Sequence, residues 1–288
     1  KWGPVEKATV AFGHGISVTP MHLLLAVNAV TNGGIYIYPT LQKRNVGAVK
    51  GERVLEDEIS AKLNIKAISE INKEIAEFDT IIFAVKPQVF RNFPTDKNMA
   101  NLANFITEKQ LILSIMAGIS ISTINNFLTN AKKIVRIMPN TPALIGEAIS
   151  VLAPSPDVLP DDLNLTKEIF ECIGQVEILS ENAMDSVTGL SGSGPAFVMM
   201  FIEALTQGGV LCGLTKKTAE KLAIQTVLGS AKMALETDSS VEELRHAVTS
   251  PGGTTIAGVA ALEENNFRNS VIKAVRAACI RSEELGKS

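Results

Sequence analysis

The sequence is poor in cysteine, nearly balanced in charge and without a long apolar run. Its three cysteines, Cys172, Cys212 and Cys279, lie far apart without metal-ligand spacing, so we expect no metal site and reduced core thiols in a cytosolic protein. With 27 Lys and Arg against 30 Asp and Glu, the net charge is -3, which argues against nucleic acid or an acidic membrane as partner. No apolar run reaches the length of a membrane span.

The residues that are present favour a folded protein that binds a small molecule. An apolar content of 46% supports a packed interior, and 288 residues exceed the usual size of a single core, so two domains are expected. The first residues, Lys1-Trp2-Gly3-Pro4, are neither a signal peptide nor an initiator methionine. We therefore expect a sequence truncated at its beginning.

The middle of the chain alternates short apolar runs with amphipathic segments, a pattern typical of a parallel sheet flanked by helices. Strands are expected at residues 78–85, 111–116 and 133–138, with edge strands at 149–153 and 175–179 and a helix at 163–173. Ligands of such sheets bind beyond the carboxyl ends of the strands. Lys86, Gly118 and Asn140 should therefore line one crevice.

The pattern changes to helices after residue 179. Apolar residues at three-to-four spacing predict helices at 196–212, 216–236 and 267–286. Thr215 suits the N-cap of the second helix, and Pro195 suits the start of the first. Many small residues in these helices permit close packing, either within one chain or in a bundle shared by two subunits.

Residues 250–255 (SPGGTT) form a loop with two adjacent glycines between hydroxyl side chains. Glycines let a backbone approach a ligand closely, and successive inward N–H groups make a site for a small anion. The loop is therefore interpreted as a cradle for a carboxylate. A plain turn between two helices is the alternative that Pro-Gly-Gly also supports.

Four motifs in order resemble the pyrroline-5-carboxylate reductase family: residues 84–88 (AVKPQ), 138–143 (MPNTPA), 190–197 (LSGSGPAF) and 250–255 (SPGGTT). The resemblance covers about residue 64 to the C-terminus. It implies a Rossmann-like α/β domain, here 1–179, followed by an all-helical substrate and dimerisation domain, here 180–288. Family dimers build the active site from helices of two subunits and reduce a cyclic imine to L-proline with NADPH or NADH, of which we favour NADPH.

The resemblance also implies roles for single residues. The substrate carboxylate would be bound by Ser250, Gly252, Gly253 and Thr254, and the hydroxyl of Thr255 would meet the imine nitrogen. A lone hydroxyl is a poor acid, so Thr255 would orient an iminium or pass a proton from water.

The cofactor's nicotinamide end has its own predicted residues. Lys86 follows a predicted buried strand, where a lysine is most often a solvated charge. The following Pro87 fixes the turn, however, so the backbone can lie against the nicotinamide ribose. Asn140 is either a turn residue or a partner of the carboxamide and ribose. The predicted cofactor residues are Ala84, Val85, Lys86, Pro87, Ala117, Gly118 and Asn140.

The first 60 residues do not show the glycine-rich dinucleotide turn that the resemblance leads us to expect. They resemble instead part of the transpeptidase domain of a class B penicillin-binding protein, in residues 11–20, 32–35, 39–41 and 51–54. The segment lacks Ser-x-x-Lys and Lys-Thr-Gly, so it is no working transpeptidase. A dinucleotide turn at 8–15 fails because Val18 stands in place of the third glycine. We infer a junction between about residues 60 and 74.

The sequence leaves two functional hypotheses open. The first is a cytoplasmic reductase, homodimeric or larger, with a pyrroline-5-carboxylate pocket and less activity than a complete relative. The alternative is a folded but catalytically impaired chimera without a working dinucleotide site. Cell-wall binding through the first 60 residues is the least favoured of the three functions, because the segment is too partial to form such a site.

Overall fold

The computed structural model describes residues 73–85, 87, 90 and 102–287. The expectations for residues 1–72 and for Lys86 lie outside this range. The chain divides into two compact units, Lys1–Gly192 with Cys279–Ser288, and Ser193–Ala278. A boundary between residues 179 and 180 stays a prediction.

The first unit holds a five-stranded sheet in the order β1-β2-β3-β4-β5. Each strand lies where the sequence predicts one. Their bounds are β1 Thr80–Phe83, β2 Leu111–Ser114, β3 Lys133–Met138, β4 Ala148–Pro154 and β5 Gly174–Ile178. Strands β1, β2 and β3 are mutually parallel, with Ile81 opposite Ile112 and Ile112 opposite Ile134.

The sheet is parallel, as expected, except for one pair of strands at β4. This strand runs antiparallel to β3, with Arg136 opposite Ala153. A parallel crossover needs about a dozen residues or more, and the short connection from Met138 to Ala148 holds only the 3-10 turn η5 (Thr141–Ile145), closed by Gly146 at φ 77. Helix α6 (Pro160–Glu171) then spans the longer gap, so β4 and β5 are parallel.

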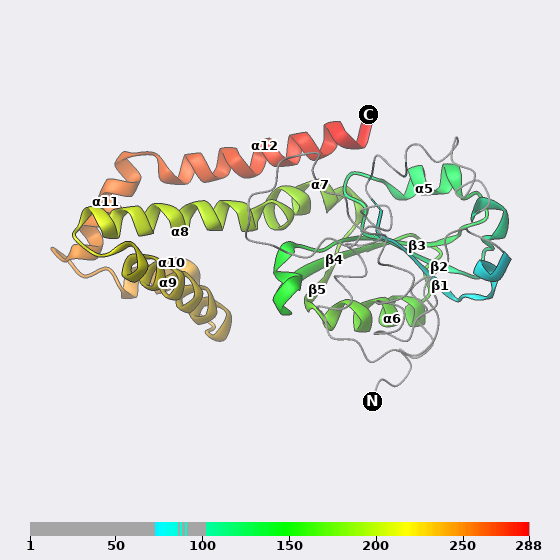
Figure 1. Ribbon diagram of the computed structural model, residues 1–288, viewed down its shortest axis with the longest axis horizontal. Coiled ribbons are helices and arrows are strands. Elements are labelled where there is room, and N and C mark those ends of the chain that lie inside the picture. The colour runs from blue at the N-terminus through cyan, green and yellow to red at the C-terminus, as the bar shows by residue number, and fades with distance from the viewer. Residues whose placement is uncertain (1–72, 86, 88–89, 91–101, 288) are drawn as a thin grey trace. The chain divides into compact units, whose positions relative to one another are not determined.

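The core of this unit lies on both faces of the sheet, because successive side chains of a strand point to opposite faces. On one face Ile112 and Ile134 join Ile124 of α5 (Ile121–Phe127) in a buried cluster. On the other face Leu113 and the buried residues of α6 form a second cluster. Figure 1 shows α5 and α6 on opposite sides of the sheet.

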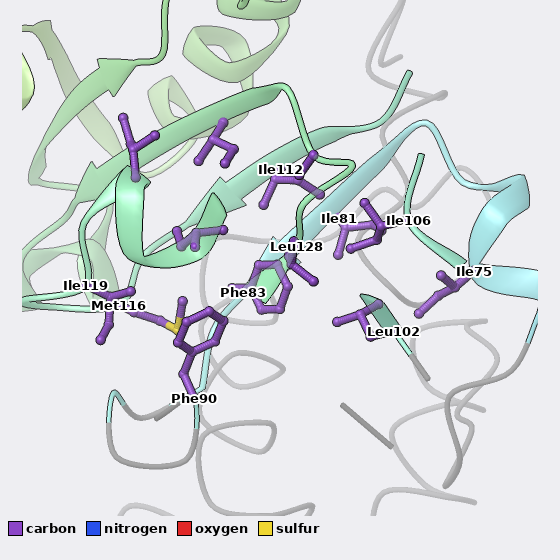
Figure 2. Packing of buried hydrophobic residues seen from close by; sticks show 14 residues of the cluster. Ile75, Ile81, Phe83, Phe90, Leu102, Ile106, Ile112, Met116, Ile119 and Leu128 are labelled. Atoms are coloured by element: carbon purple, nitrogen blue, oxygen red, sulfur yellow. The ribbon is translucent and has the colours of Figure 1, made fainter. Parts of the chain in front are cut away.

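Aromatic rings close the first cluster at the end of β1. Figure 2 shows Phe90 beside Met116 and Phe83. The ring of Phe90 meets Phe83 edge-on at 5.7 Å and Phe127 edge-on at 5.4 Å, the geometry that aromatic quadrupoles favour. This packing holds the Phe90 ring against the first cluster.

The second unit is helical. Its helices are α8 Gly194–Leu211, α9 Lys216–Glu236, α10 Val241–Ala247, α11 Thr254–Glu264 and the first part of α12, Phe267–Lys287. The predicted caps are confirmed: the Thr215 hydroxyl accepts from the Thr218 N–H at 3.3 Å, and Pro195 lies in the first turn of α8. A Cβ added at Gly209 would lie 3.0 Å from the Ala219 Cβ, so small residues do bring α8 and α9 together.

This unit buries little of its own apolar surface. In the described chain, its buried residues are Thr206, Ala219 and Ala223. Long apolar side chains are exposed instead, among them Leu211 at 89%, Leu235 at 86% and Met200 at 72%. Large exposed apolar surfaces mark interaction sites, so these helices have the character of an interaction surface.

One helical stretch is longer and more apolar than the sequence analysis expects. Glu181–Leu211 has the length and composition of a membrane-crossing helix, and most of this stretch is not buried. Length and composition alone do not distinguish a lipid cover from a protein cover, since both remove apolar surface from water.

The expectation of core cysteines is also wrong. Cys212 is exposed at the C-cap of α8, while Cys172 and Cys279 are half-buried, and all three are free thiols. Burial raises the pKa of the Cys172 thiol above its usual value, and the Glu171 carboxylate adds to the shift. The thiol therefore stays protonated, and unreactive, at neutral pH.

Gly174 gives a test of the sheet. It begins β5 at φ 148, and an added Cβ would overlap the backbone of Ala148. Gly146 is left-handed at φ 77 but has open space around it, so Gly146→Ala should cost about 1 kcal/mol of unfolding free energy. Gly174→Ala should cost clearly more in urea denaturation followed by circular dichroism. Equal losses in the two variants would contradict this packing.

Candidate active site

The turns that follow the parallel strands share one edge of the sheet. Ala84 and Val85 follow β1, Gly118 follows β2 and Asn140 follows β3. Since these strands are parallel, their carboxyl ends lie together. The structure thus brings the described members of the predicted cofactor set to one edge, whereas Lys86 lies outside the described residues.

The turn after β2 combines a left-handed glycine with a small exposed side chain. Gly118 is buried and left-handed at φ 70, while the neighbouring Ala117 is exposed. A left-handed position favours glycine because other side chains are strained there. Ala117 therefore offers a small side chain and adjacent backbone at the sheet's carboxyl edge.

Asn140 is held by two hydrogen bonds within the protein. Its Oδ1 accepts from the Ile149 N–H at 3.1 Å, and its Nδ2 donates to the Ser191 carbonyl at 3.2 Å. The amide therefore joins the β3–β4 connection to the turn that precedes α8, a role that the sequence analysis missed. One N–H and one lone pair remain for a ligand, so a cofactor contact stays a prediction.

That turn is η7 (Thr188–Gly192), one turn of π-helix between α7 (Met184–Val187) and α8. Single π turns inside helices often mark functional sites. A Cβ at Gly192 would lie 2.5 Å from the Cε of Met138. The second and third sequence motifs are therefore in contact, and a larger residue at 192 would require the end of the Met138 side chain to shift.

Sequence reasoning also missed a buried charge in β3. The Arg136 side chain is 8% exposed and forms ion pairs with Glu181 at 3.5 Å and Asp185 at 3.9 Å. The sequence did contain a sign of this charge, namely a single arginine within the otherwise apolar run at residues 134–138. A charge in a buried strand requires partners.

The predicted carboxylate cradle is a tight turn that leads directly into a helix. The Gly253 N–H donates to the Ser250 carbonyl at 3.1 Å, Pro251 occupies the second position and Gly252 is left-handed at φ 70. These are the features of a type II turn. Helix α11 then begins at Thr254 with no side chain capping it. Its first N–H groups are donors suited to an anion.

The cradle residues are open to solvent in the second unit. Ser250, Gly252, Thr254 and Thr255 are exposed, and Gly253 is half-buried. A Cβ at Gly253 would lie 2.5 Å from the Ser250 hydroxyl oxygen. The turn is thus accessible to a ligand, and its role as an anion site stays a prediction.

The short helix before this turn has its own cap. The Ser240 hydroxyl accepts from the Glu243 N–H at 3.2 Å, and the Glu243 carboxylate accepts from the Ser240 N–H at 2.8 Å. The bonds from the backbone and hydroxyl of Ser240 lower the pKa of Glu243. Because the folded pKa is depressed, this support for α10 is present above the unfolded pKa and is lost as the pH falls through the folded one.

Two family comparisons match different parts of the chain. Residues 181–285 match the pyrroline-5-carboxylate reductase dimerisation family. Residues 1–77 match the penicillin binding protein transpeptidase domain. Both resemblances in the sequence are thus confirmed, and the second match ends slightly beyond the expected junction, whose position stays a prediction.

Similarity to whole reductases covers most of the chain. The pyrroline-5-carboxylate reductase of Methanosarcina acetivorans is 44% identical over 243 residues, 84% of this chain and 88% of that protein. That of Synechocystis is 48% identical over 76% of this chain and 80% of that protein. This coverage supports the reductase expectation and gives no support to the impaired chimera.

Solved structures agree with the sequences. The pyrroline-5-carboxylate reductase of Coxiella burnetii aligns with a TM-score of 0.73 at 38% identity, covering 80% of this chain and 84% of that one. The pyrroline carboxylate reductase of Plasmodium falciparum, with NADP bound, aligns with a TM-score of 0.68 at 31% identity, covering 93% and 95%. The Rossmann-like first unit and the helical second unit are therefore those of a known enzyme fold. The chain belongs to the pyrroline-5-carboxylate reductase family.

Proposed function

We propose that this chain transfers a hydride from NADPH or NADH to the C=N bond of 1-pyrroline-5-carboxylate and so forms L-proline. The observation that carries the proposal is the type II turn at Ser250–Gly253, which opens directly into the uncapped start of α11. Backbone N–H groups at a helix start suit the single carboxylate of this substrate. The named relatives support the choice of reaction.

The protein's part in this chemistry is binding, orientation and proton supply, since the nicotinamide supplies the hydride when bound. Ser250, Gly252, Gly253 and Thr254 hold the carboxylate in this proposal. The hydroxyl of Thr255, in the first turn of α11, hydrogen-bonds the imine nitrogen and orients the iminium or relays a proton to it. The added hydride and proton together convert the C=N bond to a C–N single bond.

The residues at the sheet edge fit a nicotinamide dinucleotide. After β2, Ala117 is exposed beside the left-handed Gly118, so only a small side chain lies there. After β1, Ala84 is buried, and Val85 and Pro87 are half-buried. Lys86 and a contact from Asn140 remain part of the proposed site. We favour NADPH, which the bound NADP of the Plasmodium falciparum relative supports.

We further propose a cytoplasmic homodimer, or a larger assembly of dimers, with no nucleic-acid or membrane partner. The exposed apolar helices of the second unit support a second copy as their cover, and they lie within the residues that match the dimerisation family. Covering such surfaces is the usual basis of an obligate interface.

Two measurements on the purified chain test the proposed reaction. Oxidation of NADPH, followed by absorbance, should depend on added pyrroline-5-carboxylate and yield proline. NADPH fluorescence should show saturable binding at micromolar levels, at about -8 kcal/mol. No turnover and no binding at millimolar NADPH would reject the proposal and favour the impaired chimera.

Replacing Gly253 tests the cradle. In Gly253→Val the branched side chain would crowd the Ser250 hydroxyl and occupy the turn, so KM for the imine should rise about tenfold or more. Gly258→Ala is the matched control, because the same helix has open space there. An unchanged KM in Gly253→Val would remove the turn from the substrate site.

Replacing Thr255 tests the contact with the imine. Thr255→Ala should lower kcat by about a hundredfold or more, the usual range for losing a positioned proton-transfer group. The unfolding free energy should change by no more than about 0.5 kcal/mol because the residue is exposed. Thr255→Ser keeps the hydroxyl and should retain most of the turnover. Full activity in Thr255→Ala would show that its hydroxyl does not serve the reaction.

A further inference from the structure

The turn of residues 116–119, which holds Ala117 and Gly118, is anchored in the first unit at both ends. Met116 and Ile119 are 2% and 0% exposed and belong to the first cluster (Figure 2). The Ile119 N–H donates to the Met116 carbonyl at 3.4 Å. That distance is long for such a bond, so the turn's own hydrogen bond is weak and other contacts contribute to holding its form.

Glu181 holds the chain just after this turn. Its Oε1 accepts from the N–H of Ile121, the first residue of α5, at 2.7 Å. The same oxygen pairs at 3.5 Å with Arg136, whose side chain is 8% exposed. A carboxylate that accepts from a backbone N–H makes a charge-assisted bond, which is stronger than a neutral one. Glu181 therefore ties the exit of the turn to β3, the central strand of the sheet.

The end of α12, which belongs to the first unit, contacts the turn directly. A Cβ at Gly118 would lie 3.6 Å from the Leu285 Cβ and from the Gly286 nitrogen, an ordinary van der Waals contact. About one helical turn earlier, the Ser282 hydroxyl donates to Asp185 Oδ1 at 2.6 Å. Ser282 is 4% exposed, so this bond is shielded from water and anchors the helix end beside the turn.

Arg136 connects these two supports. Its guanidinium pairs with Asp185 at 3.9 Å as well as with Glu181. Because the fork of donors in an arginine is rigid, the two carboxylates keep a fixed spacing. The supports therefore form one network within the first unit, in which Glu181 fixes the chain after the turn and Ser282 holds α12 against it.

We propose that Glu181 and Ser282 are positioning residues for the cofactor, which hold the Gly118 turn in the form that receives the nicotinamide. This inference rests on the proposed cofactor edge. When only a fraction of the molecules has the binding form, the apparent Kd rises in inverse proportion to that fraction. Bound cofactor restores the form, because it binds that form alone. Loss of a support therefore raises Kd for NADPH and leaves kcat at saturating NADPH nearly unchanged.

Three variants of the full chain test this role by NADPH fluorescence. Glu181→Ala removes the acceptor of the Ile121 N–H and should raise Kd about tenfold, and Ser282→Ala should raise it about threefold. Glu181→Gln keeps an oxygen for the same N–H and should restore most of the affinity, a rescue that a general loss of packing would not show. In all three, kcat at saturating NADPH should stay within about twofold of the parent.

Asp162→Ala is the matched control. Asp162 also pairs with a cation of β3, Lys133 at 2.9 Å, and also accepts from a backbone N–H at a helix start, that of Leu159 at 3.4 Å. It lies on α6, on the opposite side of the sheet from α5 (Figure 1). This variant should lose stability as Glu181→Ala does, but its Kd for NADPH should stay within about twofold of the parent.

Hydrogen exchange reports on the turn itself. Without cofactor, the amides of residues 117–121 should exchange about tenfold faster in Glu181→Ala than in the parent, and saturating NADPH should restore their protection. Ser282→Ala alone decides the question if Glu181→Ala does not fold.

Two kinds of failure are distinguishable. A parent chain that binds no NADPH at millimolar levels rejects the proposed function and this inference together. A parent that binds NADPH, with unchanged Kd in Glu181→Ala and Ser282→Ala, overturns the positioning role alone. A Kd that rises equally in Asp162→Ala overturns it as well, because the effect would then follow from lost stability.

Discussion

Strand β3 is the constraint on which the remainder of the first unit depends. It is buried on both faces, so its alternating side chains must serve two cores at once. Val135 and Ile137 face α6, whereas Ile134 and Arg136 face α5 and α7. A one-residue slip would exchange these faces and place the arginine in an apolar cluster without partners. Register, helix placement and the carboxyl-edge turns are therefore fixed together.

Backbone groups rather than charged side chains shape each of the two predicted binding regions, taken separately. At the sheet edge a left-handed glycine exposes Ala117 and its peptide, and in the helical unit a left-handed Gly252 turns the chain into α11. Both arrangements rely on positions that a larger side chain would strain. In each region the arrangement of the backbone, rather than a charge, would select a ligand.

The sequence predicts the elements of this fold better than their connections. The bounds of β3 and α9 coincide with the predicted segments, because a buried strand and a capped helix each have a local pattern. The reversal of β4 escaped prediction because this strand is buried on both faces, so its apolar run reads like that of a parallel strand. The partners of Arg136 and the bonds of Asn140 escaped it because they join residues far apart in the chain. The exposure of Cys212 escaped it because an apolar neighbourhood in sequence is no measure of burial.

The scarcity of buried residues in the helical unit has a thermodynamic consequence. In the described chain this unit keeps three residues away from water and leaves side chains such as Leu211 and Leu235 uncovered. Apolar burial is the main force that opposes chain entropy. The folding free energy of these helices, taken alone, is therefore small. Where a second copy covers them, folding and association become one equilibrium, and the melting temperature rises with protein concentration. Dilution of the protein then favours dissociation and unfolding together.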